Sequence, residues 1–232
     1  MRPEIFFSDQ GLLALISDAS IDFATTDFDS PLAQDQRAYL EEKCGVEIPQ
    51  VFWRKQVHGD HILTAQGGVG SVKDCPDADA YITDERNLPI AIRTADCVPV
   101  FIFDPVHRVI GLAHAGWRGT YKAIAAKTVQ KMQEKYGSEP SDLKIVLGPS
   151  IRKCCYKIGE EFRDYFPSFV EDRGGFLYAD MISANREQLL QAGVKPENII
   201  DNGICTCCRK DYFSFRRDGK KAGRMISLMM LK

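Results

Sequence analysis

The run Val98–Phe103, with the sequence VPVFIF, constrains the fold more than any other feature of the chain. A nearly continuous apolar run without alternating polar positions predicts a strand that is buried on both faces. Val109–His114 and Ile145–Leu147 have the same character, and Ala80–Thr83 and Ile90–Thr94 also read as strands. The core of the protein is therefore expected to contain a sheet that is covered on both sides.

Helices are expected between these strands. In Tyr121–Tyr136 the apolar positions recur with a period of about 3.6 residues, and Gly137 followed by Pro140 ends the pattern. Three further helices are predicted at Gly159–Phe166, Met181–Ala192 and residues 34–43.

Two strand pairs are predicted outside this alternating region. Val51–Val57 is bulky and favours a strand, with which His61–Thr64 could pair, and Tyr212–Arg217 with Arg224–Met229 resembles a hairpin. Strand pairs thus alternate with strand–helix–strand units. This order predicts an α+β (mixed α/β) fold with mixed sheets rather than a plain doubly wound one. No repeat or long linker divides the chain, so residues 1–232 are expected to form a single domain.

Charge and composition exclude some classes of partner. The formal net charge is -2 and the pI is about 6.1, so the chain has no general basic field for a nucleic-acid backbone. The apolar run LLALI near the N-terminus is too short for a signal sequence or a membrane span. We expect a cytoplasmic protein without a nucleic-acid or membrane partner, in which the 8 cysteines are reduced thiols or metal ligands.

Three motifs place metal-binding side chains at expected strand ends. They are QVHGD with His58, TADCVP with Cys97, and HAGWRGT with His114. Two histidines and one cysteine form a catalytic type of zinc site, because three protein ligands keep a fourth position for water or substrate. No short spacing links the three residues, and a lone histidine or cysteine is more often structural. A metal centre and three unrelated core residues both remain possible at this point.

The HAGWRGT segment also suggests an anion site beside His114. Gly116 allows the backbone to approach a ligand closely, a helix is expected to begin near Thr120, and Arg118 offers a fork suited to phosphate or carboxylate. The alternative is that Arg118 pairs with a core acid and Trp117 packs. Ser150, in a turn after another strand, could face the same cleft.

Other polar groups have weaker signals. The cysteines of two segments, Cys154-Cys155 and Cys205-Thr206-Cys207-Cys208, could hold a metal together, but the irregular spacing and the lack of a nearby histidine favour reduced thiols. Asp77-Ala78-Asp79 could supply a general base, although a turn or a solvated face is the favoured interpretation.

The motifs together resemble one known family. QVHGD, TADCVPV, HAGWRGT, GPSI followed by CCYKIGEEF, and CT followed by YFSFRR occur in the order typical of the YfiH-like or laccase-domain (polyphenol-oxidase-like) proteins, also described as multifunctional purine nucleoside phosphorylases. The resemblance extends from about Val51 to the C-terminus. Lys157 departs from the pattern, in which a glutamate often follows the tyrosine.

The resemblance implies a fold, a cofactor and a reaction. It implies an α/β/β/α layered sandwich, distantly similar to the catalytic domain of cytotoxic necrotising factors. It implies zinc held by His58, Cys97 and His114, which would then be both metal ligands and catalytic residues, with Arg118, Gly116 and Ser150 as expected substrate contacts. The implied reactions are phosphorolysis of adenosine, inosine, guanosine and methylthioadenosine with inorganic phosphate as co-substrate, and deamination of adenosine.

Three other functions stay open. The first is a copper-dependent polyphenol oxidase: a set of two histidines and one cysteine suits a single copper, but 4 histidines in the whole chain are too few for a trinuclear centre as well. The second is a metal-free hydrolase with a Cys97–His114 dyad. The third is a non-catalytic factor in the editing of cell-wall precursors, which the family resemblance also raises.

Overall fold

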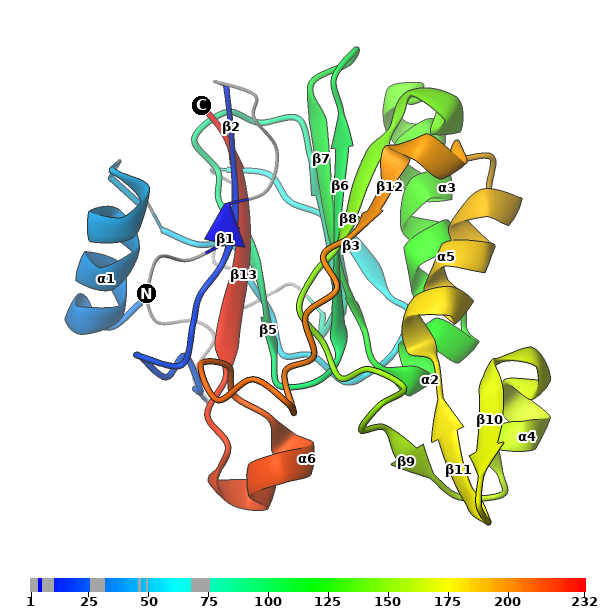
Figure 1. Ribbon diagram of the computed structural model, residues 1–232. Helices are drawn as coiled ribbons and strands as arrows, with labels where there is room; N and C mark the ends of the chain where they lie inside the picture. Colours follow the sequence, from blue (N-terminus) through cyan, green and yellow to red (C-terminus); the bar gives the residue numbers. More distant parts are fainter. Residues whose placement is uncertain (1–3, 6–10, 26–31, 46, 49, 68–75) are drawn as a thin grey trace.

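Two stacked sheets form the centre of the protein, and helices cover their outer faces (Figure 1). The computed structural model describes residues 4–5, 11–25, 32–45, 47–48, 50–67 and 76–232. The strands are β1 (Glu4–Ile5), β2 (Leu12–Ile16), β3 (Ile62–Thr64), β4 (Ala80–Thr83), β5 (Ile90–Thr94), β6 (Val98–Asp104), β7 (Val109–Ala115), β8 (Lys144–Leu147), β9 (Lys157–Ile158), β10 (Val170–Arg173), β11 (Phe176–Ala179), β12 (Ile199–Asp201) and β13 (Met225–Leu231). The helices are α1 (Gln34–Cys44), α2 (Trp117–Tyr121), α3 (Ile124–Tyr136), α4 (Phe162–Tyr165), α5 (Met181–Gln191) and α6 (Phe215–Asp218).

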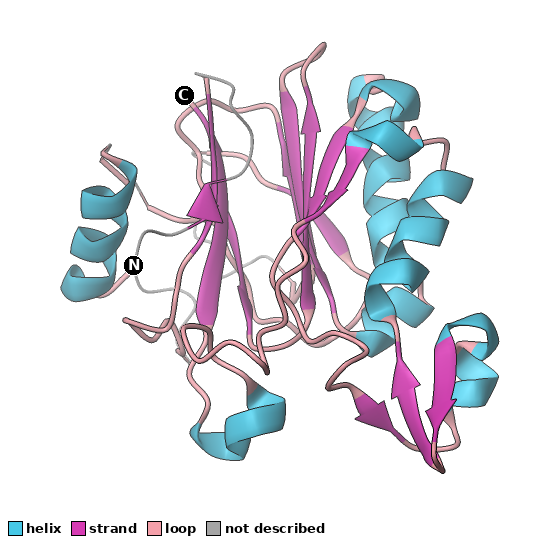
Figure 2. Cartoon of the chain, in the orientation of Figure 1, coloured by secondary structure: helices cyan, strands magenta, loops and turns pink. Residues whose placement is uncertain are grey.

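The strand order gives a mixed topology. A four-stranded antiparallel sheet has the order β1-β2-β13-β5, and a six-stranded sheet has the order β12-β8-β6-β7-β4-β3. In the larger sheet the pairs β12·β8 and β3·β4 are parallel and the remaining pairs are antiparallel. A small sheet, β10-β11-β9, lies beside α4. Figure 2 shows α1 outside the four-stranded sheet and α3 and α5 outside the larger one. The predicted mixed α/β fold with layers in the order α/β/β/α is therefore confirmed.

Alternation along β6 explains why the VPVFIF run is apolar throughout. Val98, Val100 and Ile102 join the core cluster that includes residues of α3 and α5. Phe101 and Phe103 point the opposite way and join the cluster between the two sheets. Successive side chains of a strand point to opposite faces, so a strand in the middle of a layered core needs apolar residues at every position. The predicted strand with two buried faces is confirmed.

The predicted C-terminal hairpin is wrong. Residues Phe215–Asp218 form the short helix α6, and Met225–Leu231 is β13, which pairs with β2 on one side and β5 on the other. The apolar run LLALI, too short for a membrane span or signal sequence, forms β2. Its Leu13 and Leu15 pack in the cluster that contains Leu40 of α1. The partners of β13 are distant in sequence, and no local pattern could indicate them.

The predicted strand Val51–Val57 is also wrong. Only Phe52 forms a bridge, to Ile90, and β3 pairs in parallel with β4 instead of with this segment. The side chain of Gln56 makes the two hydrogen bonds to β5 that a neighbouring strand's backbone would make. Its amide donates to the carbonyl of Arg93 at 2.9 Å and accepts from the N–H of Arg93 at 2.8 Å, so the segment is attached to β5 without regular strand pairing.

Helix boundaries differ from expectation where tertiary contacts intervene. The predicted helix Tyr121–Tyr136 begins later, as α3 at Ile124, and the separate short helix α2 precedes it, with Ala123 at φ 58° between the two. The predicted helix Gly159–Phe166 is reduced to Phe162–Tyr165. α5 and α1 lie where helices were expected. No helix in the described part of the chain is long and apolar enough to cross a bilayer.

Two neighbouring leucines of α5 test this arrangement. Leu189 is 0% exposed in the cluster beneath the six-stranded sheet, whereas Leu190 is 36% exposed. Replacing Leu189 by Ala should lower the free energy of unfolding by about 2–5 kcal/mol, because it removes buried methyl groups and leaves a cavity. Leu190→Ala makes the same chemical change on the same helix and should cost less than about 1 kcal/mol. Urea denaturation of both variants measures the difference, and equal losses would contradict the packing.

Candidate active site

Three side chains from separate segments converge at one end of the sheets. His58 lies in the loop before β3, Cys97 in the turn between β5 and β6, and His114 near the end of β7. Their ligand atoms all lie within 4.8 Å of one another. The rings of His58 and His114 meet edge to face, with 4.8 Å between their centroids. The structure therefore brings together the three residues that the motifs predicted as metal ligands.

A buried carboxylate orients two of the three segments. Oδ1 of Asp79 accepts a hydrogen bond from the N–H of His58 at 2.9 Å and contacts Nδ1 of His114 at 2.8 Å. Oδ2 accepts from the N–H groups of Gly59 at 2.7 Å and Val57 at 3.1 Å. His58 has a φ of 58°, a left-handed conformation that is costly for a non-glycine residue, and the carboxylate stabilises it.

The expectation of a solvated face is wrong for Asp79. The residue is 0% exposed and lies in the bend just before β4. The carboxylate is hydrogen-bonded to Nδ1 of His114, so Nε2 is the ring nitrogen that can bind a metal or form a hydrogen bond with Cys97. Asp79 is thus a positioning residue and not a solvent-facing base.

The electrostatics of the three side chains favour an anionic sulfur. Burial by itself raises the pKa of the Cys97 thiol, but the charge and hydrogen bonds of His114 and His58 lower it to about 6. Burial by itself lowers the pKa of His114, but the neighbouring Cys97 and Asp79 raise it to about 9. A thiolate is the form of cysteine that binds metals. Zinc bonds to nitrogen and sulfur measure roughly 2.0–2.3 Å, so one ion between these atoms fits after small side-chain adjustments.

Gly116 is required by the close packing around this centre. A Cβ at this position would lie 2.9 Å from Cδ2 of His58 and 3.1 Å from Sγ of Cys97. Gly116 is also the residue that precedes α2, which begins at Trp117 and not near Thr120 as the sequence suggested. A side chain at this position would displace the side chains of His58 and Cys97.

A cavity of about 750 Å³ opens over the three side chains. Its cationic lining residues come from several segments: Arg93, Arg118, Arg216, Lys220 and Arg224. Its aromatic lining residues are Trp117, Tyr156 and Phe215. Such a lining suits a ligand that combines negative charge with a flat ring.

The two other predicted substrate contacts lie in different surroundings. Arg118 is exposed, and its guanidinium stacks 4.3 Å from the ring of Trp117, without an ion pair to any acid in the described part of the chain. Ser150 is fully buried and lies outside the cavity lining, and its hydroxyl has no hydrogen-bond partner among the described residues. Arg118 therefore lines the cavity, whereas Ser150 is buried and does not line it.

Sequence reasoning missed Asp96, the neighbour of Cys97. Its carboxylate accepts from the hydroxyl of Thr206 at 2.7 Å and from the N–H of Arg216 at 2.6 Å, and its φ is 88°. Arg216 then lies 5.2 Å from the ring centroid of Tyr156. The only sequence signal was an acid beside the cysteine of TADC, which carries no information on partners more than a hundred residues away.

Comparisons with known proteins give the family. Residues 15–232 match the family described as multi-copper polyphenol oxidoreductase laccase. The purine nucleoside phosphorylase CA_C1699 of Clostridium acetobutylicum is 37% identical over 80% of this chain and 78% of its own length. The purine nucleoside phosphorylase YlmD of Bacillus subtilis is 37% identical over 84% of this chain and 76% of its own length.

A solved structure agrees with these sequence relatives. The crystal structure of the hypothetical protein YfiH of Bacillus licheniformis superposes with a TM-score of 0.87 and 28% identity, covering 100% of this chain and 97% of the other. The family match, the sequence relatives and the solved structure agree with one another over most of the chain. The chain therefore belongs to the laccase-like, YfiH-type family, as its motifs predicted.

Proposed function

We propose that the protein is a zinc-dependent purine nucleoside enzyme that cleaves adenosine, inosine, guanosine and methylthioadenosine with inorganic phosphate and also deaminates adenosine. The observation that carries the proposal is the combination, in one cavity, of the His58, Cys97 and His114 ligand set with cationic and aromatic lining residues. The names of the relatives in Clostridium acetobutylicum and Bacillus subtilis support the same substrate class.

The ligand set suits zinc and leaves room for catalysis. Two imidazoles and one thiolate are borderline and soft donors that zinc accepts, and a set of three protein ligands would leave one coordination position for water or substrate. When bound, zinc supplies a Lewis acid at this position. Asp79 keeps His114 in the tautomer that presents Nε2.

The other lining residues provide binding for the two substrates. In phosphorolysis a phosphate oxygen forms a bond to C1′ of the ribose, the C1′–N9 bond breaks, and the purine leaves and takes up a proton. Arg118 has a forked guanidinium that can hold a phosphate in two hydrogen bonds. Trp117 and Tyr156 present rings on which a purine can stack. These side chains would hold phosphate and nucleoside together above the metal ligands.

A copper-dependent oxidase fits this chain less well. Of the 4 histidines, two lie outside the metal centre. Nδ1 of His61 lies 2.8 Å from the carbonyl oxygen of Asp77, and Nδ1 of His107 lies 2.9 Å from the carboxylate of Asp104. Too few imidazoles remain for a trinuclear copper cluster beside the three-residue site. The proposal therefore keeps zinc and nucleoside chemistry.

The first test is phosphorolysis of inosine. The wild-type protein with inosine and phosphate should release hypoxanthine, and His58→Ala should reduce the rate to background because one metal ligand is lost. His61→Ala is the matched control, since this exposed histidine lies outside the ligand set. Chromatography of the products measures both, and the same assay with adenosine in the absence of phosphate reports deamination as inosine. Full activity in His58→Ala, or no hypoxanthine with the wild type, would contradict the proposal.

Asp79 should act on the metal through His114. Asp79→Asn keeps the shape of the side chain but removes the charge and one acceptor, and should weaken zinc binding about 10- to 100-fold. Asp77→Asn makes the same change two residues away. Asp77 is not in the group formed by His58, Cys97 and His114, so this variant should bind zinc as the wild type does. Competition with a chromophoric chelator gives both affinities. Equal affinities for the two variants would show that the carboxylate does not position His114.

Arg118 should determine the affinity for phosphate. Loss of a charge-assisted hydrogen bond costs about 1.5–3 kcal/mol, so Arg118→Ala should raise KM for phosphate roughly tenfold to a hundredfold. KM for the nucleoside should change less. Arg163→Ala, on α4 and outside the cavity lining, is the control. Steady-state kinetics at varied phosphate concentration measures this KM. An unchanged KM for phosphate in Arg118→Ala would show that phosphate binds elsewhere.

A further inference from the structure

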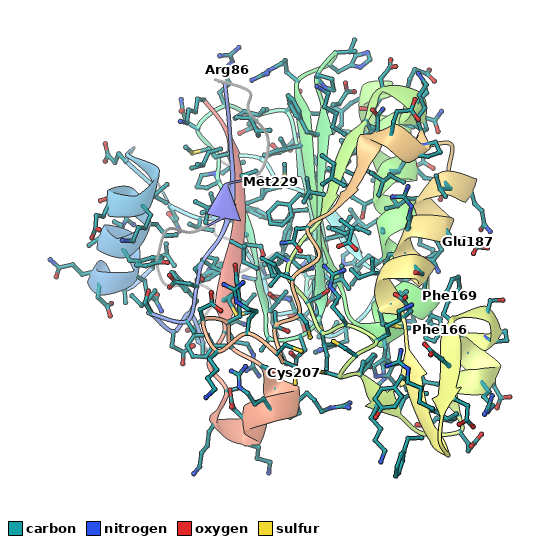
Figure 3. All side chains as sticks on the ribbon, in the orientation of Figure 1. Arg86, Phe166, Phe169, Glu187, Cys207 and Met229 are labelled. Atoms are coloured by element: carbon teal, nitrogen blue, oxygen red, sulfur yellow. The ribbon has the colours of Figure 1, made fainter. Side chains whose placement is uncertain are left out.

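A second group of metal-binding side chains lies outside the active site. Its members are four cysteines whose sulfur atoms all lie within 4.8 Å of one another: Cys154, Cys155, Cys205 and Cys208. They belong to two segments about 50 residues apart, the loop after β8 and the loop after β12. Figure 3 marks this end of the molecule by Cys207, close to α6. The nucleoside chemistry proposed above uses none of these thiols.

The spacing of the sulfurs fits a single ion. Sγ of Cys208 lies 3.7 Å from Sγ of Cys154 and 3.3 Å from Sγ of Cys155. Four sulfurs at zinc–sulfur bonds of about 2.3 Å in a tetrahedron are separated by roughly 3.8 Å. An iron–sulfur cluster needs its cysteines farther apart, because they surround several metal and sulfide ions. The observed distances therefore favour a mononuclear site.

The second segment has the backbone of a metal-binding turn. Cys205 and Cys208 have the C-x-x-C spacing, which the adjacent Cys207 makes difficult to recognise in the sequence. The N–H of Arg209 donates to the carbonyl of Cys205 at 3.0 Å and closes the turn. Such a turn directs two sulfurs to the same point.

Protein contacts already hold the two segments together. Ser150 and Cys205 form a parallel bridge, in which the N–H of Thr206 donates to the carbonyl of Ser150 at 3.0 Å. Nε of Arg152 donates to the carbonyl of Ile204 at 3.0 Å. The four thiols are thus placed before any ion binds, which lowers the entropy that binding must overcome.

Two guanidinium groups of α6 hold the backbone of the two cysteine segments. Nη1 of Arg217 donates to the carbonyl oxygens of Thr206 at 2.9 Å and Cys207 at 3.3 Å. Nη1 of Arg216 donates to the carbonyl of Lys157 at 2.6 Å, just after the first cysteine pair. A divalent ion with four thiolates would have a net charge of minus two. Arg216, whose Nη1 also lies 3.5 Å from the carbonyl oxygen of Cys155, offers a positive charge near it, whereas the charge of Arg217 is paired with Asp218 at 2.7 Å. Four thiolates without an ion would repel one another at these distances.

We propose that Cys154, Cys155, Cys205 and Cys208 bind a second, structural zinc ion that fastens the loop after β8 to the loop after β12. All four positions of the tetrahedron are then occupied by protein, so this site supports the fold and offers no position to substrate. The expectation that these cysteines are simply reduced thiols gives way to a ligand role.

The second zinc would stabilise one wall of the active-site cavity. Thr206, inside the C-x-x-C turn, donates its hydroxyl to Asp96, which is adjacent to Cys97. Tyr156, next to Cys155, lines the cavity. The ion would therefore keep these residues in place without contacting a substrate.

Zinc counting by elemental analysis tests the assignment on the full chain purified under reducing conditions. The wild type should hold two zinc ions per chain, and Cys205→Ser should hold one. His58→Ala, which disrupts only the active-site ligand set, should also hold one, and the double variant none. Cys207→Ser is the matched control: it removes a neighbouring thiol outside the four-cysteine group and should keep two.

A second measurement covers the case in which Cys205→Ser does not fold. Cobalt(II) loaded into the His58→Ala chain should show the strong sulfur-to-metal absorption of a four-thiolate site. Replacement of the exposed Cys154 by Ser should weaken it, and Cys207→Ser should leave it unchanged. A wild type with a single zinc that His58→Ala removes completely would overturn the proposal. Disulfides among the four cysteines would overturn it too, and iron in place of zinc would overturn the identity of the ion.

Discussion

The carboxylate of Asp79 is the interaction on which the active site depends. It is buried just before β4 and accepts hydrogen bonds from three consecutive backbone N–H groups, those of residues 57–59, while it also contacts the imidazole of His114. An unpaired charge in this position would be costly, and four polar contacts remove that cost. As a result, His58 takes a left-handed conformation and His114 presents Nε2, so two candidate metal ligands from different segments lie close together.

Asp96 performs a similar task beside Cys97, the third residue of the group. It precedes Cys97, has a positive φ, and accepts hydrogen bonds from Thr206 and from the backbone of Arg216. The loop that carries Cys97 is thereby connected to the C-x-x-C turn and to α6. Asp79 contacts His114, and Asp96 is the neighbour of Cys97 in the sequence. Each carboxylate therefore connects one of the candidate ligands to a distant part of the chain. The active site and the four-cysteine group are consequently parts of one connected structure.

The layered core gives these loops a rigid base. β6 and β7 are apolar on both faces because α3 and α5 cover one side and the four-stranded sheet covers the other. Cys97 precedes β6 and His114 lies on its antiparallel neighbour β7, where Pro99 is paired with His114. Antiparallel pairing brings the start of one strand next to the end of the other. The strand register therefore brings Cys97 and His114 together directly. Only His58 depends on another interaction, the hydrogen bond from its N–H to Asp79.

Local patterns in the sequence determined the buried strands of the larger sheet and the helices α1 and α5, and the motifs marked His58, Cys97 and His114 as candidate metal ligands. The continuous apolar run of β6 is a local consequence of burial on both faces, and a histidine or cysteine in a distinctive motif can be recognised without a structure. Only the tertiary structure decided that β13 lies between β2 and β5, that Asp79 is a buried positioning group, and that the two cysteine segments form one cluster. These features join residues that are far apart in the chain, and hydrophobic periodicity describes only neighbours within a single helix or strand.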